Sequence, residues 1–296
     1  MKKYINLSLS ALAILTLVGC GSDGDDTGAA PKSGVTGEVV EIATVEDAQN
    51  AVASLSSINS YSSDSVSTVM PASGFVEKQE DSILRNLRAQ PRETMDCSSG
   101  GTMSYDGVAN DTSANIVYSF NQCNNYGTLM NGSYSVRGSN DGENISLTGS
   151  FNNFKTSSEN LSININMTQA IETNIDYNPM KTTTNGTVDV EMGSENLQIG
   201  YENFELYMER ISYSYQSYQY KINGKTSIQS SINTCANGVY NIETLTPLQS
   251  AYGGYESGKM KVNGVVIEYH SGGTATVTFE DGTSETMNQN QSVVCD

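Results

Sequence analysis

The 296-residue chain contains no tryptophan, a single histidine and few basic residues, with 15 Lys and Arg against 33 Asp and Glu. Its formal net charge of −18 argues against nucleic acid and anionic headgroups as partners, because both would be repelled. With His270 as the sole histidine and no C-x-x-C spacing, the chain lacks the usual ligand pattern of a zinc site. We therefore expect no nucleic-acid partner, no metal and no cofactor.

Signatures of catalysis are also scarce. His270 has no G-x-S-x-G nucleophile turn to work with, so a Ser-His-Asp triad lacks support. The many acidic residues leave glycoside hydrolysis by paired carboxylates open, although most of them fall in expected turns or on wet strand faces. Residues 140–143 offer oxygen ligands without the spacing of a calcium-binding EF-hand loop. We expect a protein that is not an enzyme, with a hydrolase as the least favoured alternative.

No stretch is long and apolar enough to span a bilayer, since the most apolar run, residues 5–18, is shorter than the roughly 20 residues that a spanning helix needs. This run follows Lys2 and Lys3, and a basic start with an apolar middle is typical of an export signal. The run ends in Leu17-Val18-Gly19-Cys20, which resembles the lipobox of bacterial lipoproteins.

By that resemblance, residues 1–19 form a signal peptide and Cys20 becomes the lipid-modified first residue of the mature chain. Acyl chains of the palmitate type hold a soluble domain on a membrane, because each buried CH₂ contributes about 0.8 kcal/mol. Gly21, rather than aspartate, follows the cysteine, as in lipoproteins passed on to the outer membrane. We expect an outer-membrane anchor with a periplasmic or surface-facing domain; the alternative is an ordinary secretory signal.

Four cysteines remain if Cys20 carries lipid, an even number in a chain exported to an oxidising compartment. A hairpin turning on Asn110 would place Cys97 opposite Cys123, because each lies 13 residues from that centre. Cys235 would then pair with Cys295. The sequence therefore favours these two disulfides, while the other connectivities of four cysteines stay open.

Three segments follow the signal peptide. Residues 20–43 are acidic and rich in Gly, Ser and Asp, which predicts a flexible tether. Residues 44–92 predict two short helices, the first over about 45–58 with Thr44 as its N-cap. The second predicted helix has five apolar members before a stop at Pro91, namely Phe75, Val76, Ile83, Leu84 and Leu87.

Residues 93–296 change to a period of two, most clearly over residues 161–167, so one sheet face is buried and the other is wet. Turn signals at 141–142, 193–194 and 281–282 separate short neighbouring strands. We predict a mainly β fold: a large, curved antiparallel β-meander, which could form an unclosed barrel, preceded by the two helices.

A weak repeat of about 50 residues runs through this region. Asn131-Gly132 matches Asn185-Gly186 at an offset of 54 residues, and Asn153-Phe154 matches Asn203-Phe204 at an offset of 50. Chance similarity in an Asn-rich and Gly-rich chain is the alternative. The C-x-x-G-G-T, F-x-x-C and N-G-[ST] patterns look like those of uncharacterised β-rich lipoproteins of Gram-negative bacteria, and this resemblance implies a fold and an address but no activity.

We expect non-enzymatic binding or scaffolding at the cell envelope, with an envelope protein, a glycan or a lipid as ligand. Tyrosines clustered over residues 201–220 can stack on sugars, but filling a thin core is the favoured interpretation. The alternative function is a carrier that holds a lipid or other apolar ligand in an unclosed barrel. Its ligand face would be Leu161, Ile163, Ile165, Leu197, Ile199, Tyr213 and Tyr215.

Overall fold

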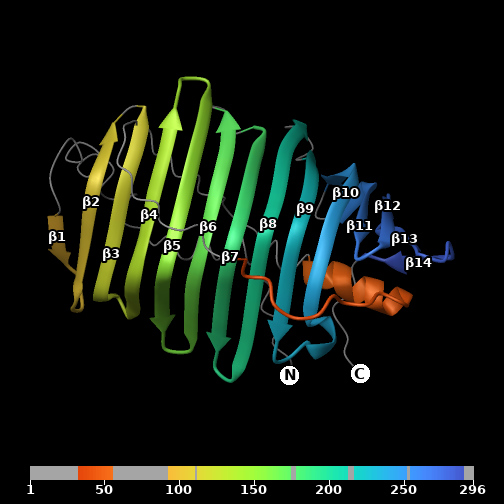
Figure 1. Cartoon of the computed structure of the whole chain (residues 1–296), viewed down its shortest axis with the longest axis horizontal. Helices are drawn as coiled ribbons and strands as arrows, with labels where there is room; N and C mark the ends of the chain where they lie inside the picture. Colours follow the sequence, from red (N-terminus) through yellow and green to blue (C-terminus); the bar gives the residue numbers. More distant parts are fainter. Residues whose placement is uncertain are drawn as a thin grey trace.

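The computed structural model describes residues 33–55, 93–110, 112–174, 178–212, 217–251 and 254–289. They form one 14-stranded antiparallel sheet in which the strand order follows the chain (Figure 1). The sheet is open, because β1 and β14 stand at its two ends rather than pairing with each other. The predicted mainly β meander is confirmed. The strands are β1 (Glu93–Asp96), β2 (Thr102–Asn110), β3 (Ser113–Asn125), β4 (Thr128–Asn140), β5 (Asn144–Ser158), β6 (Leu161–Asn174), β7 (Met180–Met192), β8 (Glu195–Ser212), β9 (Ser217–Ser230), β10 (Gly238–Ala251), β11 (Gly254–Val262), β12 (Val265–His270), β13 (Thr274–Thr278) and β14 (Ser284–Asn288).

The described part of the chain contains one α-helix, over residues 45–55, and a short 3₁₀ helix, η1 (Thr234–Ala236). Thr44 caps the α-helix as predicted: its Oγ1 accepts the Asp47 N–H at 3.2 Å, while its own N–H donates to Asp47 Oδ2 at 2.9 Å. This reciprocal pair satisfies two backbone donors at the helix start. The second predicted helix lies outside the described residues.

Alternation along each strand separates two faces of the sheet. In β6, Ile163, Ile165 and Met167 are buried, while Asn164 and Asn166 point to the other side. We call the side of these buried residues the core face and the opposite side the polar face. The three predicted turns at 141–142, 193–194 and 281–282 are confirmed as the β4–β5, β7–β8 and β13–β14 connections.

Aromatic rings fill the core face of the N-terminal half. Tyr118, Tyr134 and Phe151 lie on β3, β4 and β5, with ring centroids 4.8 and 5.6 Å apart. Phe120 and Phe154 lie beside Tyr134, with ring centroids 6.0 and 5.7 Å from its ring and 5.4 Å from each other. Burial of its hydroxyl raises the pKa of Tyr134 well above the ordinary value for tyrosine. These tyrosines act as core residues, which suits a chain without tryptophan.

At the C-terminal end, β10–β14 turn out of the plane of the earlier strands, and the α-helix lies beside β10 and β11 (Figure 1). Ala48 of the helix and Leu248 and Ile267 of the sheet are each 0% exposed and belong to one hydrophobic cluster. Tyr240 on β10 donates its hydroxyl to the Ala236 carbonyl at 2.7 Å, and burial raises its pKa to about 12. Helix, η1 and curled strands thus share one core.

Three β-bulges of the same kind interrupt the alternation on the core face. The pairs Phe120/Cys123, Phe151/Phe154 and Tyr201/Phe204 are each buried on the core face although their members are three residues apart. Between the members of each pair, one residue has a left-handed backbone, with φ of 50° at Gln122, 46° at Asn153 and 47° at Asn203. An extra residue in the bulged strand restores the side-chain direction after the irregularity.

Asn-Gly dipeptides supply partners for such irregular positions. These dipeptides do not open strands, because Asn131, Asn185 and Asn223 lie inside β4, β7 and β9. The Asn185 Oδ1 accepts the Asn203 N–H of the bulge on β8 at 2.7 Å. The following glycine, Gly186, has φ of 120°, and a Cβ there would collide with the backbone of β6. The other two asparagines accept the N–H groups of Gln122 and Thr244 at 2.8 Å each.

The predicted disulfide between Cys97 and Cys123 is present, with a Cα–Cα distance of 5.4 Å. The geometric reason given for it is wrong, because Asn110 pairs with Ser113 and the hairpin therefore turns beyond Asn110. Cys97 lies instead in the turn between β1 and β2, where its N–H donates to the Gly101 carbonyl at 3.0 Å. Cys235 is also disulfide-bonded, and its predicted partner Cys295 lies outside the described residues.

Candidate functional site

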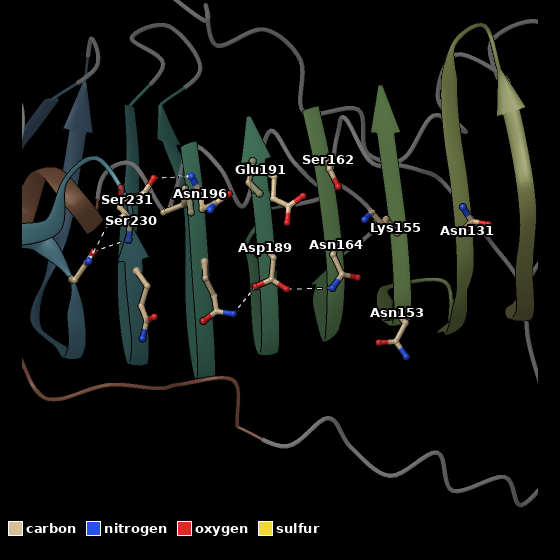
Figure 2. Close-up of a pocket in the computed structure, with 15 residues that line it drawn as sticks. Asn131, Asn153, Lys155, Ser162, Asn164, Asp189, Glu191, Asn196, Ser230 and Ser231 are labelled. Carbon is tan, nitrogen blue, oxygen red and sulfur yellow. Dashed lines mark hydrogen bonds between the residues drawn. The ribbon is translucent and has the colours of Figure 1, made fainter. Parts of the chain in front are cut away.

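A row of polar side chains crosses the middle of the polar face. Its members are successive pairing partners on five neighbouring strands, so they stand side by side across the sheet (Figure 2). Because strands lie about 4.8 Å apart, the row presents polar groups at that interval over roughly 19 Å. We call this the polar row, and it consists of Lys155 (β5), Asn164 (β6), Asp189 (β7), Gln198 (β8) and Gln229 (β9).

Alternation explains why these residues gather here. Asn164 lies between the buried Ile163 and Ile165, and Gln198 lies next to the buried Ile199. Burial of the aliphatic neighbours on the core face directs the intervening polar side chains to the opposite side. The antiparallel register then aligns one polar residue per strand.

Asp189 organises the centre of the row. Its Oδ2 accepts a hydrogen bond from Asn164 Nδ2 at 3.3 Å, and its Oδ1 accepts one from Gln198 Nε2 at 2.6 Å (Figure 2). An ionised carboxylate only accepts hydrogen bonds, so both amides must turn their NH₂ groups toward it. The Asn164 Oδ1 and Gln198 Oε1 accept no hydrogen bond from the residues that the structure describes. Two acceptors are thereby held in place without a protein donor.

A second line of polar residues runs beside the polar row. Ser162 pairs with Glu191, and Glu191 pairs with Asn196, each two positions along its strand from a row member. Asn196 donates its N–H to Ser231 Oγ at 2.8 Å, which joins the line to the loop after β9. Together the two lines floor an open depression of about 780 Å³. Its lining is Asn131, Asn153, Lys155, Ser162, Asn164, Asp189, Val190, Glu191, Asn196, Leu197, Gln198, Gln229, Ser230, Ser231 and Asn237.

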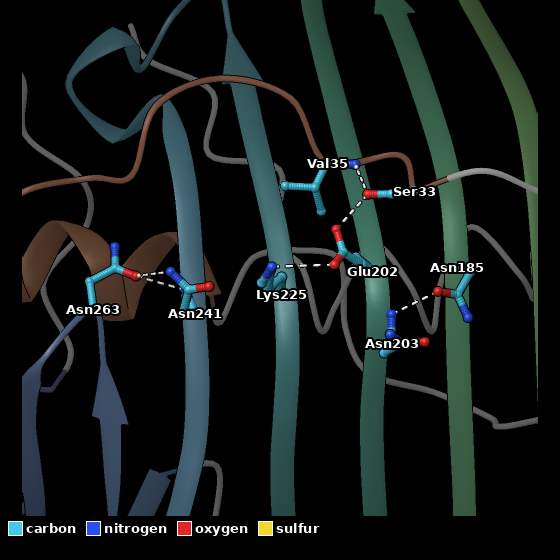
Figure 3. A network of polar contacts seen from close by, with 8 residues as sticks. All are labelled: Ser33, Val35, Asn185, Glu202, Asn203, Lys225, Asn241 and Asn263. Atoms are coloured by element: carbon cyan, nitrogen blue, oxygen red, sulfur yellow. Dashed lines mark hydrogen bonds and ion pairs between the residues drawn. The ribbon is translucent and has the colours of Figure 1, made fainter.

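An N-terminal segment crosses the sheet beside the polar row. Residues 33–43, which we call the strap, run across the sheet before the helix begins (Figures 1 and 3). The Thr36 N–H donates to Ser227 Oγ at 3.2 Å, and Gln229 Nε2 of the polar row donates to Thr36 Oγ1 at 3.3 Å. The strap therefore contacts the row directly at β9.

Glycines allow the strap to lie against the sheet backbone. The Gly34 N–H donates to the Tyr201 carbonyl at 3.3 Å. A Cβ on Gly34 would collide with the Gly186 carbonyl and with Thr187, and a Cβ on Gly200 would collide with the Gly34 carbonyl. Three glycines thus meet where the strap crosses β7 and β8.

Charged and polar side chains fix the strap's first residue. Ser33 Oγ donates to Glu202 Oε2 at 2.6 Å, and Lys225 Nζ lies 3.3 Å from Glu202 Oε1 (Figure 3). The Ser33 hydrogen bond and then the Lys225 interactions lower the pKa of Glu202. Residues 33–43 were predicted as the end of a flexible tether; instead, these contacts hold them on the sheet.

The far end of the strap pairs with the start of β10. Val40 N–H donates to the Val239 carbonyl at 3.1 Å, and Val239 N–H donates to the Glu38 carbonyl at 2.8 Å. Asn263 completes the junction, because its Nδ2 donates to the Val40 and Val239 carbonyls at 2.9 Å each. Its Oδ1 accepts the Asn241 N–H at 2.7 Å. The backbone N–H and carbonyl of Val239, which do not pair with β11, are therefore hydrogen-bonded to the strap and to Asn263.

The residues predicted as an apolar ligand face lie mainly in the core. Ile163, Ile165 and Ile199 are 6%, 1% and 1% exposed. Leu161 and Leu197 are partly buried against the same cluster. Tyr213, Tyr215 and the predicted lipid-bearing Cys20 lie outside the described residues.

Two further sequence expectations concern membranes and metals. In the described ranges, no helix has the length and apolar character needed to cross a bilayer. Within the same ranges, no group of three or more His, Cys, Asp or Glu side chains converges to hold a metal ion. His270 contacts Thr276, with 2.8 Å between Nε2 and Oγ1.

Sequence reasoning missed the polar row. The signal was present in the polar residues between apolar ones at Asn164, Asp189 and Gln198, but only the strand register shows that they align. Comparison with known proteins adds no further constraint, since no protein-family model, no curated protein and no solved structure matches the chain.

Proposed function

We propose that this protein is a lipid-anchored binding protein of the bacterial cell envelope, attached through Cys20 and acting without catalysis. The observation that carries the binding role is the polar row, where Asp189 holds two amide side chains in fixed orientations beside an open depression. Preorganised hydrogen-bonding groups lower the entropic cost of binding a ligand. The lipobox resemblance supports the anchor.

Burial favours this function over an apolar carrier. A carrier needs an accessible apolar trough, whereas Ile163, Ile165 and Ile199 belong to a packed hydrophobic cluster. The depression on the polar face is lined mostly by amides, hydroxyls and charged groups. We therefore place the ligand on the polar face.

Incorporation of radiolabelled palmitate tests the anchor. Wild-type protein should become labelled in cells, and Cys20→Ser should not, because the thioether requires the cysteine sulfur. Label that persists in Cys20→Ser would contradict lipidation at this residue.

Co-sedimentation tests the binding role. The full lipidated chain, kept in detergent micelles, is mixed with insoluble cell-envelope material that has been washed free of membrane. Wild type should pellet with this material, and Asp189→Ala should pellet about tenfold less, because the two amides lose their common partner. Glu205→Gln is the matched control, since Glu205 is a carboxylate on β8 outside the lining of the depression. Equal pelleting of Asp189→Ala and wild type would contradict binding at the row.

A further inference from the structure

We propose that the polar row binds a neutral, hydroxyl-rich glycan chain laid across strands β5–β9. The inference rests on the proposed function, because it names the ligand class of the same site. Amide, carboxylate and hydroxyl groups line the depression, and one lysine stands at its β5 side.

The hydrogen-bonding capacity of the row matches sugar hydroxyls. A hydroxyl group both donates and accepts, and so does a side-chain amide. The Asn164 Oδ1 and Gln198 Oε1 accept no hydrogen bond from described residues, so each can accept from a sugar hydroxyl. The Asp189 carboxylate keeps both amides oriented, which removes part of the cost of ordering them on binding.

Charge disfavours an anionic ligand, and the lining does not form a metal site. The lining carries Lys155 against Asp189 and Glu191, and the whole chain has a formal charge of −18, so a polyanion would be repelled. A metal ion would need converging acidic or histidine ligands, and no such group occurs in the described ranges. A neutral glycan meets neither the repulsion of a polyanion nor the ligand requirement of a metal ion.

Position in the sheet disfavours a peptide strand. An extended peptide gains most by pairing with free backbone groups at a sheet edge. The polar row lies on the interior strands β5–β9, whose backbones pair with neighbours on both sides. A ligand here meets side chains only, at the strand spacing of about 4.8 Å. A pyranose chain repeats at a comparable spacing and carries hydroxyls along its whole length.

The two ends of the depression differ in their surroundings. The residues after β9, including Ser231 and Asn237, line the β9 end, and the strap contacts the row there through the hydrogen bond from Gln229 to Thr36. The β5 end, with the exposed Lys155, stays open. Since no aromatic ring lines the depression, hydrogen bonds alone hold the sugars, and we expect dissociation constants on the order of 1 mM.

Saturation-transfer difference NMR tests the proposal, because it detects weak ligands of a large protein. The full lipidated chain in micelles is mixed separately with cellohexaose, chitohexaose and maltohexaose, and with a hyaluronan hexasaccharide as the anionic comparison. At least one neutral hexasaccharide should give signals, which should fall about fivefold or more in Asp189→Ala. Gln198→Ala serves as a second variant in case Asp189→Ala does not fold. Glu205→Gln should retain the wild-type signals.

Three results would overturn the proposal: no signal from any neutral hexasaccharide, signals only from the hyaluronan fragment, or neutral signals unchanged in the folded row variants. If co-sedimentation with envelope material still depends on Asp189 in these cases, the glycan class is wrong and the binding function stands. If that dependence is absent as well, both proposals fail.

Discussion

At the scale of single residues, the strap can lie against the sheet because glycine has no Cβ. Gly34 lies so close to Gly186 and Gly200 that an added Cβ would overlap carbonyl oxygens. Backbone atoms cannot move away as a flexible side chain can. Conformational freedom is therefore a minor reason for glycine at position 34, and close approach is the major one.

We expect Gly34→Ala to lift the strap from β7 and β8. The overlap with backbone should lower the free energy of unfolding by about 2 kcal/mol, within the range for overpacked sites. Urea unfolding measures this loss, and hydrogen exchange should show faster exchange at the Thr36 amide. Gly149→Ala is the control, because its Cβ would have ordinary contacts of 3.8 and 4.0 Å. Equal stability of the two variants would contradict the packing argument.

Glu202 gives the strap a dependence on pH. Its pKa is lowered in the folded protein, chiefly by the Ser33 hydrogen bond, from an ordinary value of 4.5. A lowered pKa means that the contribution to stability is present above the unfolded-state value and is lost as pH falls through the folded value. We expect Glu202→Gln to lower the thermal midpoint slightly at pH 7, with the gap to wild type closing below about pH 4.5.

Thermal scans of wild type and Glu202→Gln from pH 7 to pH 3 measure this gap. Glu285→Gln, on the edge strand β14, controls for the general effect of removing a negative charge. A gap that stays constant down to pH 3 would show that the carboxylate does not act through its charge.

At the scale of elements, bulges keep long strands in register with the core. Each of the three buried pairs, such as Phe151 and Phe154, spans one residue with a left-handed backbone. Beyond that residue the alternation is shifted by one position, so that apolar side chains again point to the core face. The N-G motifs then bond to the irregular strands, so bulge and motif work as one device.

Removal of one motif acceptor should destabilise the sheet. In Asn185→Ala, the Asn203 N–H loses its 2.7 Å partner, which should cost about 1–2 kcal/mol of unfolding free energy. Denaturant unfolding measures the change. Asn166→Ala is the control, because Asn166 lies on β6 and its side chain makes no hydrogen bond with described residues. A loss as large in Asn166→Ala would contradict the role of the acceptor.

Sequence patterns predicted elements well where the chemistry is local. Alternation located β6, turn residues located three hairpins, and Thr44 located the helix start. Bulges escaped prediction because a strict period of two assigns Phe154 and Phe204 to the wrong face. The strap escaped it because contacts such as Ser33 to Glu202 join residues 169 positions apart. The polar row escaped it because only the strand register aligns Asn164, Asp189 and Gln198.

At the scale of the whole molecule, the open meander builds its core mainly from neighbouring strands. Each strand contacts the strands before and after it, so folding uses many contacts of short sequence separation. Long-range connections come from the strap, which joins residues 33–40 to β7–β10. The Cys97–Cys123 disulfide secures the opposite end of the sheet.

Loss of that disulfide should weaken the β1–β3 end. The bond closes a sequence separation of 26 residues, for which restriction of the unfolded chain contributes about 3 kcal/mol. Urea unfolding of the double variant Cys97→Ala/Cys123→Ala should show a loss of that order. A change below about 1 kcal/mol would contradict it. Peptide mapping without reduction should join Cys97 to Cys123 and Cys235 to Cys295.

The strap also decides where a mechanical load enters the fold. A pull on the chain ahead of Ser33 first reaches the hydrogen bonds of Ser33 and Gly34, in the middle of the polar face. The force there acts across several strands, so it does not break the hydrogen bonds of an edge strand one after another. Beyond it, the pairing at Val40 and the capped helix hold in series. Under such a load we expect the strap to detach first, while the β-meander stays folded.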